Sequence, residues 1–215
     1  MVRLTAPLCL ASGVKYAWLD LPATEVDQAA RTMLGWRLVA NGVVVRLTEV
    51  EAYSGLGADP ASHAHRGRTP RNAIMFGPAG FLYVYQIYGM YQCINIVCGE
   101  EGVAAAVLLR AGEVVEGVET ARDRSPGARR DRDLAAGPGK LTRALGIGKA
   151  DYGTSVVDGT GPLTITRPSG TEEPAIEAGP RVGVTSAHDV AWRFWIKGDP
   201  TVSAYRRHTP KRRRA

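Results

Sequence analysis

The chain has 215 residues, of which 45% are hydrophobic and 22% charged, an ordinary composition for one globular domain with a sizeable core. No apolar run approaches the ~20 residues of a membrane span, and residues 1–13 do not have the pattern of a secretory signal, so we expect an intracellular protein without a membrane anchor. The net charge of +6 lies at one end: residues 206–215 hold six of the 27 basic residues and no acid, leaving 1–205 charge-balanced.

We expect residues 1–205 to form one domain and the basic tail, residues 206–215, to be disordered because it lacks apolar side chains to bury. The tail is either a solubilising end or an arm that adds sequence-independent attraction to phosphates. The three cysteines are odd in number and lack metal-site spacing, which predicts reduced thiols and no structural metal. Cys93 and Cys98 lie in an apolar pattern typical of small core residues.

The first elements follow from local signals. Residues 24–34 have the pattern of a helix, with Thr24 as its cap and Gly35 as its stop. Asn41-Gly42 lies between two apolar segments, 36–40 and 43–53, and predicts a β-hairpin. Residues 54–70 are rich in Gly, Asp, Pro and Ser and predict a loop.

The rest of the chain adds mainly strands. Gly89-Met90 predicts a second hairpin, between strands at 81–88 and 91–98. We expect helices at 115–124 and 141–145, with Gly137-Pro138-Gly139 breaking the chain before the second, and further strands at 103–110, 163–166, 181–184 and 193–196. Strands outnumber helices and are joined by hairpins, which predicts a single α+β domain, mainly an antiparallel β-sheet with a protruding β-hairpin and surrounding helices.

Chemistry-bearing residues gather between positions 47 and 110. Alternate residues of a strand share a face, so Glu49, Glu51 and Tyr53 point the same way. Two acids on one face indicate a solvated edge or a glycosidase-like carboxylate pair, and periodicity alone does not choose between them or between the two glutamates. Tyr83 and Tyr85 also share a face, although strand tyrosines are more often half-buried sheet residues than ligand-stacking ones.

The combination is more informative than its parts. A lone histidine such as His63 is more often a hydrogen-bonding loop residue than a catalyst. Acid, imidazole, arginine and stacked aromatic rings together are what a protein needs to grip a nucleic acid base and hydrolyse a bond beside it.

The order of several motifs is more specific still. From about residue 18 to 203 the chain resembles the alkyladenine (3-methyladenine) DNA glycosylase family, through Glu51-Ala52-Tyr53, Ser62-His63, Thr69-Pro70-Arg71-Asn72, Leu82-Tyr83-Val84-Tyr85, Ile87-Tyr88-Gly89-Met90-Tyr91, Asn95-Ile96, Leu108-Leu109-Arg110, Gly137-Pro138-Gly139-Lys140 and Arg181-Val182-Gly183-Val184. The resemblance implies a single α+β domain without metal or cofactor. It also implies a monomeric, monofunctional enzyme of base excision repair that flips alkylated or deaminated purines out of double-stranded DNA and hydrolyses the N-glycosidic bond.

The resemblance also assigns roles to residues. Glu51 matches the general base that activates the attacking water, and Arg110 an arginine that helps to hold this water. The residues implied to enclose or select the extruded base are Tyr53, His63, Tyr85 and Asn95, of which Asn95 would disfavour normal guanine by crowding its exocyclic amine. Tyr88 matches a hairpin-tip residue that wedges into the duplex. Candidates for contacts with the DNA backbone are Arg66, Arg68, Arg71 and Lys140. The implied location is the cytoplasm, with nucleoid association in a bacterium, or the nucleus in a eukaryote.

Three rival interpretations remain at this level. One is a bifunctional glycosylase-lyase with a lysine nucleophile. Another is a non-enzymatic reader that grips bases on aromatic rings, although pure binding needs no general base. The third is a sugar glycosidase that uses Glu49 and Glu51, for which a hairpin-tip tyrosine and a basic tail would have no use.

Overall fold

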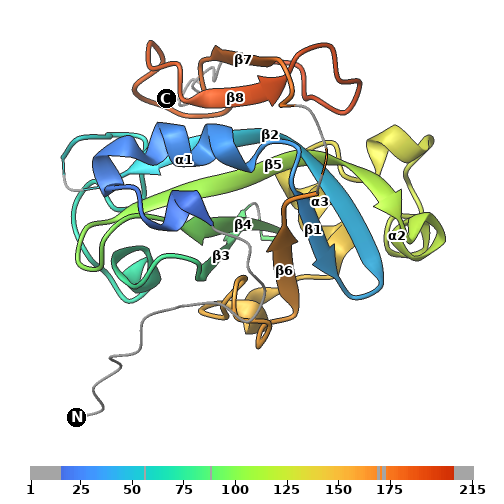
Figure 1. Ribbon diagram of the computed structural model, residues 1–215, viewed down its shortest axis with the longest axis horizontal. Coiled ribbons are helices and arrows are strands. Elements are labelled where there is room, and N and C mark those ends of the chain that lie inside the picture. Colours follow the sequence, from blue (N-terminus) through green and yellow to red (C-terminus); the bar gives the residue numbers. More distant parts are fainter. Residues whose placement is uncertain (1–15, 56, 88, 169, 171–172, 206–215) are drawn as a thin grey trace, which may run out of the picture.

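The computed structural model describes residues 16–55, 57–87, 89–168, 170 and 173–205 (Figure 1). Its strands form one antiparallel sheet, in the order β3 (Leu82–Ile87), β4 (Tyr91–Val97), β5 (Ala105–Glu116), β2 (Val43–Ser54), β1 (Arg37–Ala40) and β6 (Leu163–Thr166). Strand β8 (Arg193–Ile196) pairs with the second half of β2 and with β7 (Ile176–Gly179). The predicted α+β class and its mainly antiparallel sheet are confirmed.

In the described part of the chain, three α-helices accompany the sheet: α1 (Val26–Met33), α2 (Val118–Arg124) and α3 (Pro138–Leu145). Helix α1 packs against β2, and α3 packs against β4 and β5 (Figure 1). The 3-10 turns are short and lie at Ala17–Leu19, Ala23–Glu25, Ala73–Phe76, Asp131–Asp133 and Lys149–Asp151. Among the described residues, no helix is long and apolar enough to cross a membrane.

The local predictions hold where the signal is a turn. Asn41 and Gly42 both adopt positive φ, 49° and 78°, as a type I′ turn between paired strands requires. The helix predicted at 24–34 is present as α1 after a 3-10 turn at Ala23–Glu25, but Thr24 lies inside that turn and does not cap the helix. The predicted hairpin of β3 and β4 also forms, and its described pairs run from Leu82 with Ile96 to Ile87 with Tyr91.

Four other expectations need correction. Residues 115 and 116 continue β5, because Glu116 pairs with Val44, and α2 therefore begins only at Val118. Pro138 and Gly139 do not break the chain before α3 but form its first turn, where proline needs no N–H partner. Residues 181–184 form no strand, and β7 was not predicted at all.

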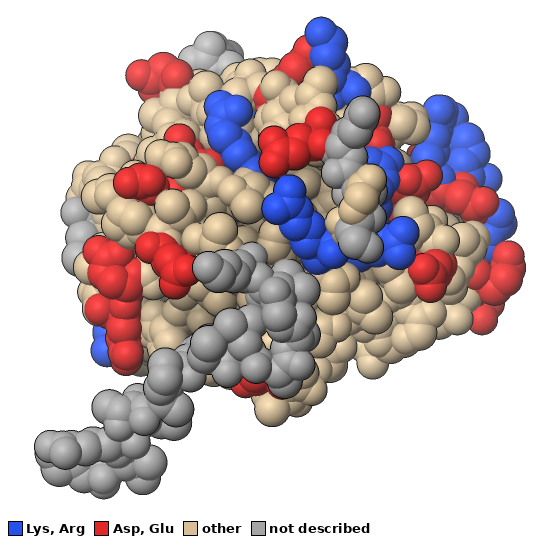
Figure 2. All heavy atoms as spheres, in the orientation of Figure 1, with Lys and Arg blue, Asp and Glu red and all other residues tan. Residues whose placement is uncertain are grey.

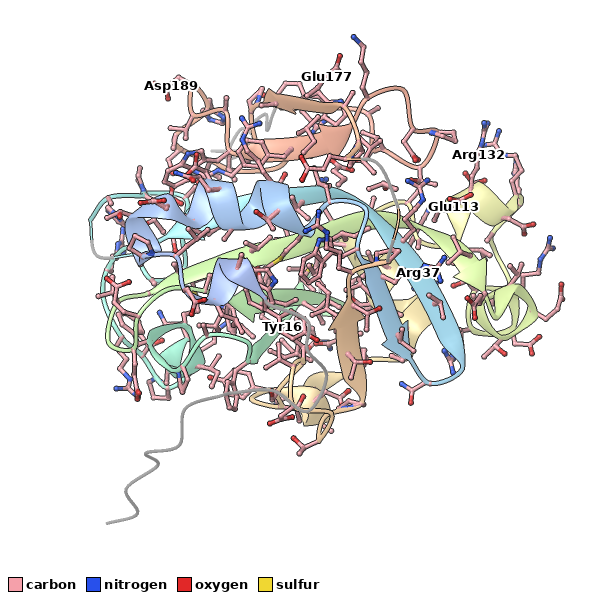
Figure 3. All side chains as sticks on the ribbon, viewed as in Figure 1. Tyr16, Arg37, Glu113, Arg132, Glu177 and Asp189 are labelled. Carbon is pink, nitrogen blue, oxygen red and sulfur yellow. The ribbon has the colours of Figure 1, made fainter. Side chains whose placement is uncertain are left out.

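Side chains project from both faces of the sheet (Figure 3), and alternation separates two environments. One set of strand positions contributes to the main core, together with residues of α1 and α3, and includes Val50, Ala52, Val107, Leu109, Ile94 and Ile96. The intervening positions on β2, β5, β4 and β3 point the other way and carry Glu51, Leu108, Asn95 and Tyr83. These four lie on one row of cross-strand partners, because Tyr83 pairs with Asn95, Asn95 with Leu108 and Leu108 with Glu51.

The candidate active site

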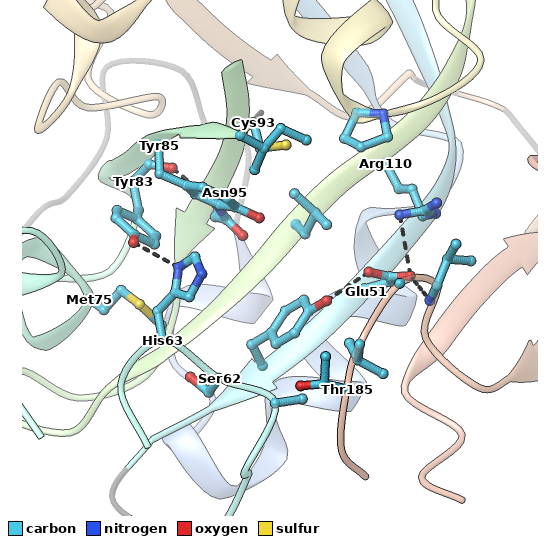
Figure 4. A pocket seen from close by; sticks show the side chains of 18 of the residues that line it. Glu51, Ser62, His63, Met75, Tyr83, Tyr85, Cys93, Asn95, Arg110 and Thr185 are labelled. Atoms are coloured by element: carbon cyan, nitrogen blue, oxygen red, sulfur yellow. Dashed lines mark hydrogen bonds and ion pairs between the residues drawn. The ribbon is translucent and has the colours of Figure 1, made fainter. Parts of the chain in front are cut away.

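A cavity of about 570 Å³ lies on this second face of the sheet. Its floor comes from β2, β3, β4 and β5, and its walls come from residues 60–63, residues 182–185 and Pro138 at the start of α3. Glu51 and Arg110 lie on one side of the cavity, and His63, Tyr83 and Tyr85 lie on the other (Figure 4). The register of the sheet brings together residues from Glu51 to Arg110, and the loop at 182–185, up to 134 positions from Glu51, closes the cavity from outside the sheet.

Glu51 is fully buried at the end of the row. Its Oε2 accepts a hydrogen bond from the Tyr53 hydroxyl at 2.8 Å, and its Oε1 accepts one from the Val182 N–H at 2.8 Å. The Arg110 guanidinium approaches Oε1 at 3.5 Å. Burial raises the pKa of Glu51, and Arg110, Val182 and Tyr53 each oppose that rise.

These contacts leave Glu51 able to bind one more donor. An ionised carboxylate offers about four lone-pair positions. Hydrogen bonds from Tyr53 and Val182 take two of them, and the Arg110 guanidinium, an ion-pair partner at 3.5 Å, faces Oε1 as well. Among the described residues that line the cavity, Glu51 is the only acid. It is therefore the only carboxylate there that could accept a hydrogen bond from a molecule in the cavity.

Glu49 has a different role in the structure. It is also fully buried but does not line the cavity. Its Oε1 accepts hydrogen bonds from Arg110 Nε at 3.0 Å and from the Ser203 hydroxyl at 2.9 Å, and its Oε2 accepts one from the Ser203 N–H at 2.9 Å. Arg193 Nε lies 3.1 Å from Oε1. The interpretation of Glu49 and Glu51 as a solvated edge is therefore wrong, because neither side chain reaches solvent.

Arg110 reaches both glutamates because the strand pairing is irregular at this point. Glu49 pairs with Ala111 while Val50 pairs with Leu109, which leaves Arg110 as the extra residue of a β-bulge. Bulges of this kind redirect side chains and are over-represented beside active sites. The side chain of Arg110 is 10% exposed, and its charge is compensated by two carboxylates.

The opposite side of the cavity is aromatic. The rings of Tyr83 and Tyr85 stack with centroids 5.3 Å apart, and His63 meets the Tyr85 ring edge-on at 4.6 Å. His63 Nδ1 lies 2.9 Å from the Tyr83 hydroxyl. Partial burial and the nearby Arg71 lower the pKa of His63, so its ring is neutral at neutral pH. Burial raises the pKa of Tyr83 to about 12 and that of Tyr85 further, so both hydroxyls stay protonated.

Asn95 and Cys93 complete the floor between the aromatic and acidic sides. Asn95 is buried, and its Nδ2 donates to the Tyr83 carbonyl at 3.1 Å, which fixes the orientation of the amide. Cys93 pairs with Tyr85 across the hairpin, and burial raises the pKa of its thiol to about 11. Cys93 and Cys98 are both buried free thiols; Cys98 belongs to the main core as predicted, whereas Cys93 lines the cavity.

The remaining predicted residues lie around the cavity or beyond the described chain. Arg66 and Arg68 are exposed on the loop that follows His63, and Arg71 lies 5.7 Å from the Tyr85 ring centroid. Lys140 is exposed in the first turn of α3, two residues after the cavity-lining Pro138. Tyr88 and the tail, residues 206–215, lie outside the described residues.

Sequence reasoning missed a buried ion pair behind the cavity. Arg181 binds Asp59 through two hydrogen bonds, of 2.6 and 2.7 Å, and both side chains are almost fully buried. The sequence predicts a strand at 181–184, but the backbone there pairs with no strand of the described chain. The Val182 N–H instead donates to Glu51. Within the described chain, no three His, Cys, Asp or Glu side chains are grouped as ligands for a metal ion.

Comparison with known proteins agrees with this geometry. The model of a family described as methylpurine-DNA glycosylase matches residues 20–200. A protein of Nocardia farcinica is 54% identical over 183 residues, covering 83% of this chain and 86% of that protein. One of Streptomyces avermitilis is 55% identical over 200 residues, covering 89% and 92%. Both are named "Putative 3-methyladenine DNA glycosylase". The chain therefore belongs to the methylpurine-DNA glycosylase family, and it is a DNA glycosylase, a hydrolase of N-glycosyl bonds that acts on alkylated purines in DNA repair.

Proposed function

We propose that the protein extrudes a damaged purine from duplex DNA into the cavity and hydrolyses its N-glycosidic bond with a water molecule that Glu51 activates. The observation that carries this proposal is the position of Glu51, the only acid among the described residues that line a cavity otherwise built from aromatic, amide and apolar groups. An enzyme that acts on a base inside a duplex must take the base out of the stack, at a cost of a few kcal/mol.

The chemistry follows from the contacts of Glu51. Its remaining lone pair accepts a proton from the water while the water oxygen attacks C1′ of the sugar. The C1′–N bond breaks, its electrons leave with the purine, and the products are a free base and an abasic sugar. A methylated, cationic purine leaves as a neutral molecule and needs no general acid. Arg110 balances the charge of the carboxylate and, in this proposal, helps to hold the water.

The aromatic side suits the base. Tyr53, His63 and Tyr85 line the cavity together and would enclose a flat ring. A cation over an aromatic face gains roughly 0.5–2 kcal/mol, which favours an alkylated purine over its neutral parent. A neutral His63 adds no repulsion to a cationic base.

Selection against normal bases rests on Asn95 in this proposal. Its amide is fixed by the Tyr83 carbonyl on the cavity floor and would crowd the exocyclic amine of guanine. Tyr88, the residue before Gly89, would fill the gap that the extruded base leaves in the duplex. Gly89 and Met90, the next two residues, are exposed, which supports an accessible tip.

Contacts with the DNA backbone are proposed for the arginines and the lysine near the mouth of the cavity and for the tail. Arg66, Arg68, Arg71 and Lys140 are all exposed. Basic and acidic side chains are interspersed on the face drawn in Figure 2, in agreement with the charge balance of residues 1–205. The tail carries the excess positive charge and would add attraction to phosphates.

The rivals make different predictions from the same cavity. No lysine is among the described residues that line it, so we propose a monofunctional glycosylase rather than a lyase. Glu49 lies outside the cavity, which leaves a sugar glycosidase without its second carboxylate. A reader of flipped bases would not need a buried carboxylate with a free acceptor position.

The test is a panel of DNA duplexes, each with one damaged purine. We expect release of the free base and formation of an abasic site that breaks only after alkali treatment. Borohydride should trap no covalent complex. Trapping would identify the lyase, and tight binding to damaged DNA without base release would identify the non-enzymatic reader.

A further inference from the structure

We propose that Arg181 is a positioning residue that sets the geometry of Glu51 from behind the cavity, through Val182 on one side and Tyr53 on the other. This inference rests on the proposed role of Glu51 as the base. It assigns a task in the reaction to a buried ion pair that touches neither the base nor the water.

Arg181 joins three segments that are distant in the chain. Its guanidinium binds both carboxylate oxygens of Asp59, at 2.6 and 2.7 Å, and donates to the Ala52 carbonyl at 2.9 Å. Ala52 is the neighbour of Glu51 on β2. Asp59 in turn accepts hydrogen bonds from the N–H groups of Ser54 and Ala61, which anchors the loop that leads to His63.

Two of the groups that touch Glu51 depend on Arg181 for their position. Val182 is the next residue, and its N–H donates to Glu51 Oε1 at 2.8 Å. The Arg181 guanidinium also lies 4.6 Å from the centroid of the Tyr53 ring, whose hydroxyl donates to Glu51 Oε2 at 2.8 Å. One buried side chain therefore holds a donor to each carboxylate oxygen.

The shape of arginine matters here, beyond its charge. A guanidinium is planar and presents several N–H groups in a fixed fork, so it can bind Asp59 with two atoms, reach a carbonyl and lie on an aromatic ring at once. A lysine ammonium keeps the charge but is a single point donor on a flexible stem. An Arg181→Lys variant would keep the ion pair with Asp59 and lose the support of Val182 and Tyr53.

The consequence is measurable as a pH profile. Hydrogen bonds to an ionised carboxylate lower its pKa, so a loosened Val182 N–H and Tyr53 hydroxyl would let the pKa of Glu51 rise. The charged and titratable groups that surround Glu51 are Glu49 and Tyr53 on β2, Arg110 on β5, Tyr85 on β3, Cys93 on β4, Arg193 on β8 and Arg181 itself. Of these groups, only Tyr53 is in contact with Arg181, so a substitution at position 181 acts on Glu51 through Tyr53 and Val182.

The experiment compares four full-length proteins in single-turnover excision of 7-methylguanine from a duplex between pH 4.5 and 9, after subtraction of uncatalysed depurination. They are the wild type, Arg181→Lys, the double variant Arg181→Met with Asp59→Asn, and Leu163→Ala. The double variant removes a pair with no net charge, so no buried ion is left unpaired. Leu163 is buried on β6 outside the cavity, and its variant controls for lost stability.

We expect the low-pH limb of the rate to move to higher pH by about one unit in Arg181→Lys and in the double variant, and to stay in place in Leu163→Ala. Rates on the high-pH plateau should fall less than rates at low pH. An unmoved limb in the folded double variant would overturn the proposal, and so would an equal shift in Leu163→Ala. A double variant that does not fold would place Arg181 in the scaffold and overturn it too.

Glu51→Gln, measured in the same series, separates this inference from the proposed function. If Glu51→Gln excised the base at the wild-type rate, Glu51 would not be the general base, and the proposed function would be refuted. If Glu51→Gln were inactive and the low-pH limb of the rate profile stayed in place in the two Arg181 variants, only the role of Arg181 would be refuted.

Discussion

Glu51 and Glu49 are two residues apart on one strand, and their surroundings give them different properties. Both are fully buried, but Glu49 is neutralised by Arg110 and Arg193 and bound by Ser203. Glu51 lines the cavity, where its partners are Tyr53, Val182 and Arg110. Burial disfavours its charged form, so it is a stronger base than an exposed glutamate when it is ionised.

We predict that Glu51→Gln binds damaged DNA normally and loses excision by about 10²- to 10⁴-fold, the usual range for a general base. Glutamine keeps the size of the side chain and can still accept from Tyr53 or Val182, but it cannot take up a proton. Single-turnover kinetics and a binding titration measure the two quantities separately.

Glu49→Gln is the matched control for this prediction. It removes the same charge two residues away, outside the cavity, so the expected loss is smaller and comes from a loosened Arg110. A larger loss in Glu49→Gln than in Glu51→Gln would show that the wrong acid was chosen.

The pKa of Glu51 predicts the direction of the pH dependence. Only the ionised carboxylate accepts the proton, and the folded protein raises its pKa above the ordinary value of 4.5. The rate of excision of a cationic base should therefore reach its plateau at high pH and fall as the pH drops through this raised pKa. The fall should begin at a higher pH than it would with an exposed glutamate. The rate of Glu51→Gln should be flat across that range, and a wild-type rate that stays constant down to pH 4 would contradict the assignment.

The part of the site that can be predicted from the sequence is the set of side chains that strand alternation places on one face. The stretch from 47 to 110 contains most of the residues that meet in the cavity, but alternation treats Glu49 and Glu51 alike. The structure separates them through a bulge at Arg110 and through Ser203, which lies 154 residues from Glu49. Arg181 and Asp59 are 122 residues apart and form no local pattern, so their ion pair becomes visible only when the chain is folded.

The secondary structure elements that the sequence predicts well are determined by adjacent residues, and those that it does not predict depend on residues distant in the chain. The hairpin at Asn41-Gly42 was predictable because two adjacent residues determine its turn. Strand β7 was not predictable from its sequence, Ile-Glu-Ala-Gly, because it is a partly exposed edge strand. Its Glu177 projects outward (Figure 3), and its described pairing partner is β8. Residues 181–184 have strand composition, but Arg181 is bound by Asp59 and Val182 by Glu51.

The hairpin of β3 and β4 carries the next prediction. We predict that Tyr88→Ala barely changes the melting temperature and reduces the fraction of extruded base, seen as a smaller fluorescence change from ethenoadenine in duplex DNA. Excision from single strands or bulges should suffer less, since little stacking must be replaced there. Met90→Ala, at a neighbouring position that is 70% exposed, is the matched control for a change at the same tip.

The alternative for Tyr88 is a core residue. Removal of a large buried aromatic ring costs roughly 3–5 kcal/mol of unfolding free energy. A Tyr88→Ala protein that melts much earlier yet extrudes the base normally when folded would refute the wedge.

At the scale of the whole molecule, charge is unevenly distributed along the chain. Residues 1–205 are balanced, and six basic residues follow. We predict that removal of residues 206–215 weakens DNA binding without altering lesion preference. Each phosphate contact adds ~0.9 to the slope of log affinity against log salt, so the truncated protein should show a slope flatter by up to several units. An unchanged slope would reduce the tail to a solubilising end.

The alternation of the sheet has a consequence for how such an enzyme can diversify. On β3 and β4, the residues that face the cavity, such as Tyr85, Cys93 and Asn95, alternate with those that build the main core, such as Val84 and Ile94. In the proposed function, a substitution at such a cavity position would change which purines fit and leave the side chains of the main core in place. On these two strands, the proposed lesion range can therefore change at the cavity positions while the residues between them keep the main core intact.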